Sequence, residues 1–130
     1  MAEYEGIVYG IIPAALEQAS NAAANMLGHK RAKYKGTVPS NTLKIVGIDL
    51  TSMGLVNPEE PTYEEIKKTD QPKGVYKKLV LDKGKIVGAI LLGDKKGVAS
   101  IRKLIARETD ITKYKNLILN DDFDYKKVTA

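Results

Sequence analysis

The clearest pattern of apolar and polar positions lies between residues 75 and 92. Two apolar runs, 75–81 and 85–92, are separated by Asp82-Lys83-Gly84. Such runs predict a β-hairpin with a three-residue loop in which Gly84 takes the left-handed conformation. The second run is apolar at almost every position, which indicates a central strand covered on both faces. We expect Gly88 in this strand to let a bulky side chain of a neighbour lie across it.

The residues before this hairpin predict further strands. Residues 42–50 read as one strand, with Leu43 and Ile45 on the same face, and 51–54 continue it after a bulge. Residues 57–61 contain two prolines and predict a loop. Residues 62–70 fit a strand or a helix, and an exposed strand is favoured. A turn at 71–74 then leads into the hairpin.

A helix rich in alanine is predicted near the amino terminus, after an extended segment at 1–12. Pro13 suits the first helical turn, where a missing N–H costs nothing, and Gly28 suits the left-handed position after the last turn. Six alanines lie between them, so the helix has a small face that a large neighbour could approach closely.

Two more helices are predicted after the hairpin. Asp94 is a suitable N-cap for a helix over 95–107, whose apolar residues recur at helical spacing. A shorter helix is predicted over 111–119, with Tyr114, Leu117 and Ile118 facing inward. Residues 120–125 predict a turn that leads to a frayed end.

These elements predict an α+β fold. It comprises an antiparallel sheet of about four or five strands with one or two C-terminal helices, preceded by the alanine-rich N-terminal helix. A basic linker at 29–35 and a turn-rich stretch after it separate two parts of the chain, 1–35 and 36–130.

Composition excludes several kinds of site. The 130 residues include no cysteine and a single histidine, His29, which excludes disulfides and thiolate metal sites and argues against zinc. The three aspartates at 121, 122 and 124 lack the spacing of a calcium loop, so no metal is expected. No apolar run is long enough to span a membrane, and a cytoplasmic location is expected. The net charge of +5 indicates a solvated basic surface. No nucleic-acid binding is expected, because the chain has no tryptophan, one phenylalanine and only scattered tyrosines to stack between basic residues.

Two stretches carry a family resemblance. Residues 2–15, which read Ala-Glu-Tyr-Glu-Gly-Ile-Val-Tyr-Gly-Ile-Ile-Pro-Ala-Ala, and the helix after them resemble the last FAD-binding segment of the pyridine-nucleotide-dependent flavoprotein oxidoreductases. Residues 42–54 resemble the first strand of their C-terminal domain. The similarity is to the branch of NADH:rubredoxin reductases, NADH oxidases and the flavin part of NAD(P)H nitrite reductases, and it covers essentially the whole chain.

The resemblance implies a site and a role. In such enzymes the N-terminus of this helix lies beside the flavin, so Ile12, Pro13, Ala14 and Ala15 would contact FAD, with Ala14 and Ala15 as N–H donors. Residues 1–35 would be a remnant of the FAD-binding domain, and 36–130 the C-terminal interface domain. That domain would cover the flavin and offer a dimerisation or acceptor-docking surface. In the intact enzyme, hydride would pass from NADH or NADPH to FAD, and electrons to an acceptor such as rubredoxin, oxygen or nitrite. The basic surface would suit an acidic partner such as rubredoxin.

The chain also departs from the family. The Gly-Asp pair whose aspartate holds the flavin is missing; one residue, here Met1, should separate it from Ala2. No Gly-x-Gly-x-x-Gly motif occurs, and the His-Pro-Thr and cysteines of the disulfide-reductase branch are absent. We therefore expect a C-terminal fragment that does not bind FAD usefully, cannot bind NADH and is inactive alone.

Two other hypotheses remain open at this point. One is a free-standing basic binding module, and the other is an oligomerisation module in which the alanine-rich helix packs on a second copy or on its own body.

Overall fold

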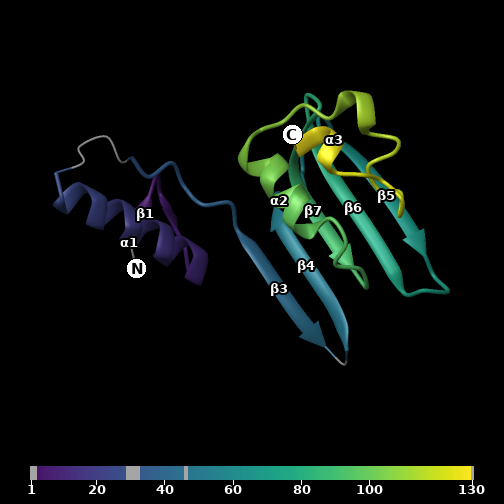
Figure 1. Cartoon of the computed structure of the whole chain (residues 1–130), viewed down its shortest axis with the longest axis horizontal. Coiled ribbons are helices and arrows are strands. Elements are labelled where there is room, and N and C mark those ends of the chain that lie inside the picture. Colours follow the sequence, from purple (N-terminus) through teal and green to yellow (C-terminus); the bar gives the residue numbers. More distant parts are fainter. Residues whose placement is uncertain (1–2, 29–32, 46, 130) are drawn as a thin grey trace. The chain divides into compact units, whose positions relative to one another are not determined.

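The computed structural model describes residues 3–28, 33–45 and 47–129 and divides into two compact units, Met1–Pro39 and Ser40–Ala130 (Figure 1). The predicted basic linker at 29–35 lies partly outside the described residues. His29 and Met1 lie outside them altogether. Each unit is described by itself below.

The first unit contains a small hairpin and one long helix. Strands β1 (Glu3–Tyr4) and β2 (Ile7–Val8) pair antiparallel, so the segment predicted as extended turns back on itself at Glu5-Gly6. The predicted helix is confirmed as α1 (Ile12–Met26), with Pro13 in its first turn. Gly28 follows it with φ +84°, as expected of a residue that ends a helix.

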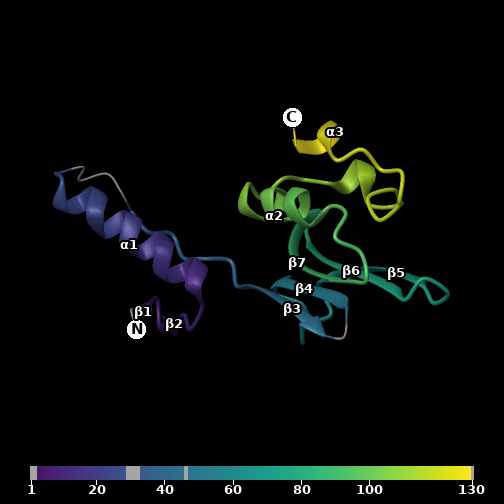
Figure 2. The same ribbon diagram turned by 60° about the horizontal axis from the view of Figure 1, so that its bottom comes forward.

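The second unit is a five-stranded antiparallel sheet with its helices on one face (Figures 1 and 2). Its strands are β3 (Ser40–Ile45), β4 (Ile48–Gly54), β5 (Glu64–Asp70), β6 (Val75–Asp82) and β7 (Lys85–Leu92). The spatial order β3-β4-β7-β6-β5 places β7 in the centre, as its apolar sequence predicts. The exposed strand favoured for residues 62–70 is confirmed as β5. The α+β fold with about four or five strands is likewise confirmed.

The single strand predicted for residues 42–50 is wrong. This stretch contains a hairpin in which Ile45 pairs with Ile48, so the chain reverses direction between these two residues. Gly47 has φ +80°, a conformation that other residues adopt only at a steric cost. The bulge expected before residues 51–54 is also absent from β4. The sheet has its register shift in β6 instead, between Val80 and Leu81.

The hairpin of β6 and β7 is confirmed, but two details differ from prediction. Asp82 pairs with Lys85, so the loop has two residues rather than three, and Lys83 and Gly84 both have positive φ, at +48° and +80°. Two such residues in succession are typical of a type I′ turn, whose twist matches that of the strands. Gly88 accommodates the backbone of Leu55 rather than a side chain, because a Cβ at Gly88 would lie 1.8 Å from the Leu55 carbonyl oxygen.

The first helix after the sheet is shorter than predicted. It is α2 (Val98–Ala106), and its N-cap residue is Gly97 in the left-handed conformation, not Asp94. The Asp94 carboxylate accepts the Lys96 N–H at 2.7 Å, so it caps a turn that precedes the helix. A Cβ at Gly97 would meet the Tyr125 ring within 3 Å, which explains why a glycine occupies this position.

The helix predicted for residues 111–119 is wrong. The structure has a 3-10 helix, η1 (Thr112–Tyr114), followed by turns, and Leu117 is 52% exposed rather than inward. Ile118 is buried as expected, and Tyr114 is half-buried. The tail turns at 120–125 as predicted but does not fray directly, because a short helix, α3 (Lys126–Thr129), follows.

The core of the second unit lies between the sheet and the segments on its helical face (Figure 2). Fully buried side chains come from β4, β6, β7, α2 and the segment after α2; they include Met53, Leu79, Leu81, Ile86, Leu91, Ile101, Leu104, Ile111 and Ile118. Phe123, Tyr125 and Val128 pack against this core from the tail. No helix in the described part of the chain is long and apolar enough to cross a membrane.

Candidate functional site

The N-terminus of α1 presents backbone donors without a side-chain cap. The N-cap residue is Ile11, which has no polar side chain, and Pro13 has no N–H. The Ala15 N–H donates to the Ile11 carbonyl at 3.3 Å. The N–H groups of Ile12 and Ala14 have no hydrogen-bond partner among the described residues, so these two are the donors that the helix offers to a ligand.

The side chains of the four predicted contact residues do not share one environment. Ile12 is 76% exposed, and Pro13 and Ala15 are exposed too, whereas the Ala14 methyl group is fully buried. Ala14 can therefore contribute its N–H but not its side chain. Of the two donors expected from the sequence, Ala15 donates its N–H to the Ile11 carbonyl, whereas the Ala14 N–H has no partner among the described residues.

Much apolar surface surrounds this helix. The exposed large apolar side chains of the described part of the first unit have exposed fractions from 40% to 87%; they are Ile7, Val8, Ile12, Leu16, Met26, Leu27 and Val38. Four alanines of α1, at positions 15, 19, 22 and 23, are exposed as well. Apolar area of this kind is typical of a surface that another protein segment or a ligand covers.

A polar contact that the sequence analysis missed fixes one side of α1. The Thr37 hydroxyl donates to the Glu17 carboxylate at 2.6 Å, and the Tyr34 hydroxyl donates to Thr37 at 2.5 Å. Tyr34 also packs edge-on against Tyr4 and Tyr9, with ring centroids 5.0 and 6.3 Å apart. The segment after α1 is thereby tied to the helix at its polar face.

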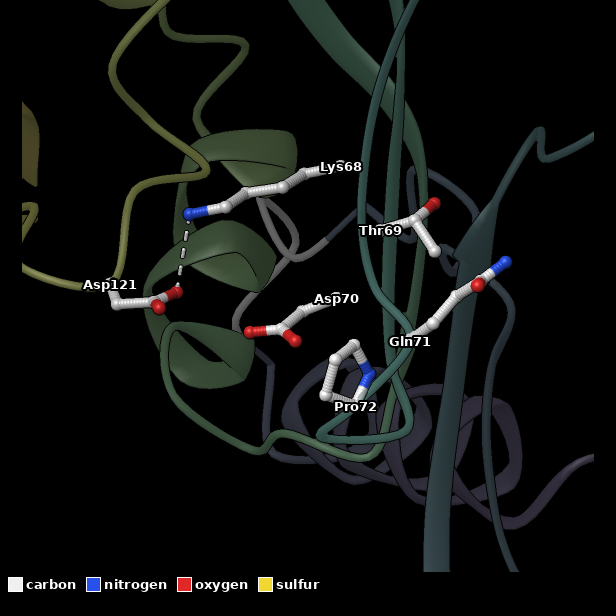
Figure 3. A pocket seen from close by; sticks show the side chains of 6 residues that line it. All are labelled: Lys68, Thr69, Asp70, Gln71, Pro72 and Asp121. Carbon is white, nitrogen blue, oxygen red and sulfur yellow. Dashed lines mark hydrogen bonds and ion pairs between the residues drawn. The ribbon is translucent and has the colours of Figure 1, made fainter.

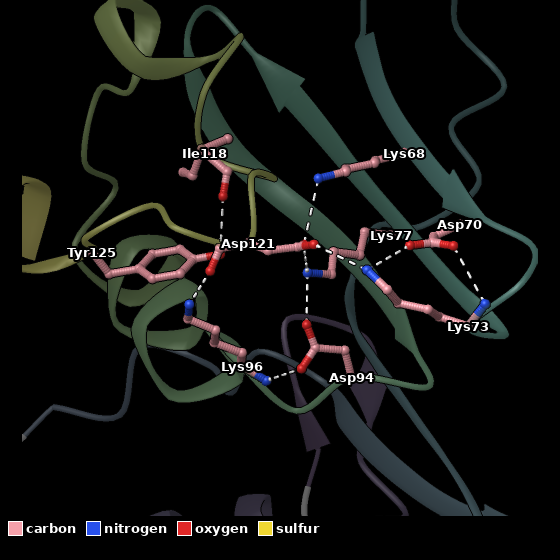
Figure 4. A network of polar contacts seen from close by, with 9 residues as sticks. All are labelled: Lys68, Asp70, Lys73, Lys77, Asp94, Lys96, Ile118, Asp121 and Tyr125. Carbon is pink, nitrogen blue, oxygen red and sulfur yellow. Dashed lines mark hydrogen bonds and ion pairs between the residues drawn. The ribbon is translucent and has the colours of Figure 1, made fainter.

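The second unit contains a network of lysines and aspartates around Lys77 (Figure 4). Lys77 lies on β6 with its side chain only 3% exposed, and its ammonium group contacts Asp94 at 2.7 Å and Asp121 at 3.3 Å. A buried ammonium group is tolerated only where carboxylates compensate its lost hydration, as these two do.

Asp121 joins this network to the strand beside it. Its carboxylate lies 3.4 Å from the ammonium group of Lys68 and 4.0 Å from that of Lys73, and its carbonyl oxygen accepts from Lys96. A cavity of about 250 Å³ lies among Lys68, Lys73, Lys77 and Asp121. An adjoining groove of about 490 Å³ runs past Lys68 to Pro72 (Figure 3).

The network shifts the pKa values of its members so that each charged form is favoured. Burial opposes the charged forms of Lys77 and Asp94, but their mutual hydrogen bond prevails, so the pKa of Lys77 is raised and that of Asp94 is lowered. The hydrogen bond from Lys77 and the charge of Lys68 lower the pKa of Asp121. Folding therefore favours the charged state of all three groups.

Acid should weaken the second unit through this network. An aspartate with a lowered folded pKa stabilises the fold above its unfolded pKa of about 3.9, and this contribution is lost as the pH falls through the folded pKa. Lys77, with a raised pKa, contributes fully below about pH 10.4 and loses its contribution only at higher pH. We expect Asp94→Asn to lower the free energy of unfolding by about 1–3 kcal/mol at pH 7 and to make it less dependent on pH below about 4. Urea denaturation between pH 2.5 and 7 measures both effects, and an unchanged acid dependence in this variant would contradict the assignment.

Comparison with known proteins gives a family. Residues 39–109, more than half of the chain, match the family described as rubredoxin NAD+ reductase C-terminal domain. A nitrite reductase [NAD(P)H] of Bacillus subtilis is 39% identical over 111 residues, covering 85% of this chain and 14% of that protein. An assimilatory nitrate reductase electron transfer subunit of the same organism is 35% identical over 121 residues, covering 93% of this chain and 16% of that protein.

The fold has a counterpart among solved structures. The chain superimposes on a covalent putidaredoxin reductase–putidaredoxin complex with a TM-score of 0.71 at 17% identity, covering 94% of this chain and 28% of the other. This likeness shows the fold alone, and the chain spans only a small part of each curated relative. The family match and the 39% identical relative confirm the resemblance inferred from the sequence. The chain belongs to the rubredoxin NAD+ reductase C-terminal domain family, in the group of pyridine-nucleotide oxidoreductases that includes nitrite reductases.

Proposed function

We propose that this chain is the C-terminal part of an NAD(P)H-dependent FAD oxidoreductase of the rubredoxin reductase, NADH oxidase or nitrite reductase type, and that it is inactive alone. The match of residues 39–109 to the family carries this proposal. The relatives support it further, since the chain corresponds to only 14% and 16% of their lengths and the remainder would supply the FAD and NAD domains. Membership of this family disfavours the free-standing binding or oligomerisation module.

We propose that the first unit faces the flavin. When bound, FAD would accept a hydride from the nicotinamide, and its reduced ring would carry negative charge. The N–H groups of Ile12 and Ala14 point out of an uncapped helix N-terminus, which stabilises negative charge. Pro13 and Ala15 would contribute apolar contact in the same turn. The uncapped donors and the exposed apolar side chains around them fit such a ligand.

We propose that the second unit covers the flavin site and offers a dimerisation or acceptor-docking surface. The net charge of +5 favours an acidic acceptor, for which a rubredoxin is the example that the family name suggests. The complex of putidaredoxin reductase with putidaredoxin supports a docking role for a protein of this fold.

The proposal can be tested with a chimera. In this chimera the chain replaces the matching segment of the Bacillus subtilis nitrite reductase, with which it shares 39% identity. We expect the chimera to retain bound flavin and NAD(P)H oxidation, while the chain alone yields no stoichiometric flavin spectrum when FAD is added. Loss of flavin from a folded chimera, or tight FAD binding by the chain alone, would contradict the proposal.

A substitution at the N-cap of α1 tests whether the N-terminus of this helix faces the flavin. Ile11→Asp supplies the missing cap for the Ala14 N–H, which should stabilise α1 by about 0.5–2 kcal/mol. In the chimera, the same carboxylate would occupy the donor and repel the reduced flavin, so flavin affinity should fall by about tenfold. Thermal denaturation and flavin titration measure the two effects. Ile11→Asn, which caps without a charge, is the matched control, and a stabilised helix with unchanged flavin affinity in both variants would contradict the assignment.

A further inference from the structure

Three ammonium groups converge on one carboxylate at the edge of the sheet. Lys68, Lys73 and Lys77 lie 3.4, 4.0 and 3.3 Å from the oxygens of Asp121. Lys73 and Lys77 also contact Asp70 and Asp94, at 3.0 and 2.7 Å. Among the described residues, Lys68 contacts no carboxylate other than Asp121. Removal of the Asp121 carboxylate would leave four lysines here, Lys96 included, against two aspartates.

The Asp121 side chain is held by charge rather than by burial. It is 60% exposed, whereas Lys77 beneath it is 3% exposed. The rest of the tail has anchors of its own, because Tyr125 donates to the Ile118 carbonyl at 3.0 Å and packs against the core. The carboxylate can therefore leave the lysines without releasing the tail.

We propose that Lys68, Lys73 and Lys77 form a binding site for an acidic peptide segment, and that Asp121 occupies this site in cis until an acidic segment of a partner protein replaces it. The inference rests on the docking role proposed above and assigns it a place. This place is the cavity of about 250 Å³ among Lys68, Lys73, Lys77 and Asp121, together with the adjoining groove of about 490 Å³. The same lysines then hold either carboxylate, so docking exchanges one ion pair for another.

The occupant already present argues for a peptide rather than a small anion. Asp121 stands in the sequence Asn-Asp-Asp-Phe-Asp, and it is held through its backbone as well as its side chain, because Lys96 donates to its carbonyl oxygen. An acidic peptide segment can supply both groups from one residue, a side-chain carboxylate and a backbone carbonyl. The buried Lys77 provides a fixed positive charge at the base of the site.

The test uses the chain's own acidic sequence as the probe. A fluorescent peptide with the sequence of residues 118–124 is titrated into the whole chain at low salt, and fluorescence anisotropy reports binding. We expect Asp121→Ala, which empties the site, to bind the peptide at least about tenfold more tightly than the unsubstituted chain does. Asp122→Ala is the matched control, since Asp122 lies next in sequence but outside the network, and it should bind like the unsubstituted chain.

A second variant shows whether the lysines are responsible. Lys68→Ala combined with Asp121→Ala should lose most of the gained affinity, and rising salt should weaken the binding that remains. Equal affinity in the Asp121→Ala and Asp122→Ala variants, with both folded by circular dichroism, would overturn the proposal. Competition of succinate or sulfate as strong as that of the peptide would also overturn it, because the site would then select a small anion. None of these results depends on flavin, so failure here is distinguishable from failure of the chimera.

Discussion

Replacement of Leu104 by alanine should lower the free energy of unfolding by about 2–5 kcal/mol. Leu104 lies on the inner face of α2, fully buried in the core cluster with Ile101 and residues of β6 and β7. Truncation removes buried methyl groups and leaves a cavity that α2 cannot close, because Ile101 and Ile105 hold the helix on either side. Urea denaturation of the whole chain, followed by circular dichroism, measures the loss.

Leu117→Ala provides the matched control. Its side chain is 52% exposed, and its loss should change the unfolding free energy by only about 0.5 kcal/mol. If residues 111–119 formed the helix expected from the sequence, Leu117 would face inward and its loss would cost as much as that of Leu104. The pair of variants therefore also tests the observed structure of this segment. Equal losses in both variants would contradict it.

Replacement of Gly88 by alanine should be nearly as damaging, at about 1–3 kcal/mol or more. The added Cβ would lie 1.8 Å from the Leu55 carbonyl oxygen and 2.4 Å from the Leu55 carbonyl carbon. These are backbone atoms, so relief requires a shift of the chain after β4 and weakens the 2.9 Å hydrogen bond from Leu55 N–H to Val87. Unfolding measurements report the energy, and faster amide exchange at Leu55 would locate the shift.

Gly10→Ala is the corresponding control. A Cβ at Gly10 meets nothing within 4 Å, and its backbone is not in the left-handed region. We expect a change of about 0.5 kcal/mol or less. A Gly88→Ala variant as stable as this control, with unchanged exchange at Leu55, would show that the two backbones do not approach as described.

The sequence predicted those parts of the fold that depend on local pattern. The apolar run of residues 85–92 gave the central strand, and the proline and glycine at either end of α1 gave its limits. Prediction failed where one residue decides between similar local patterns. Alternation continues through Gly47, so the hairpin of β3 and β4 resembled one strand until the pairing of Ile45 with Ile48 was known. Asp94 has the usual N-cap chemistry, but its carboxylate is engaged with Lys77 and Lys96.

The candidate sites were predicted unequally for the same reason. The N-terminus of α1 is contiguous, and its motif was visible in the sequence. The lysine network was missed because its members come from β5, β6, the segment before α2 and the tail, which only the folded chain brings together. Lysines of this kind read as solvated surface, and residue type alone does not distinguish the buried Lys77 from the exposed Lys73. A lysine on a strand that is otherwise apolar is the one signal that could have been used.

The central position of β7 also constrains how the second unit folds. Three of the four strand pairings in this sheet, β3–β4, β5–β6 and β6–β7, join strands that are neighbours in sequence. The fourth pairing joins β4 to β7 across a long stretch of chain, with Leu50 opposite Leu92. Closing the loop between β4 and β7 lowers the conformational entropy of the chain before their contacts can offset this loss. The β4–β7 pairing should therefore be the slow step in assembling the sheet. The core residues of α2 follow β7 directly and cannot be enclosed until both halves of the sheet have met. Folding rate is therefore governed by one strand junction, and variants at Met53 or Ala89, which pair across it, should slow folding more than variants within the local hairpins do.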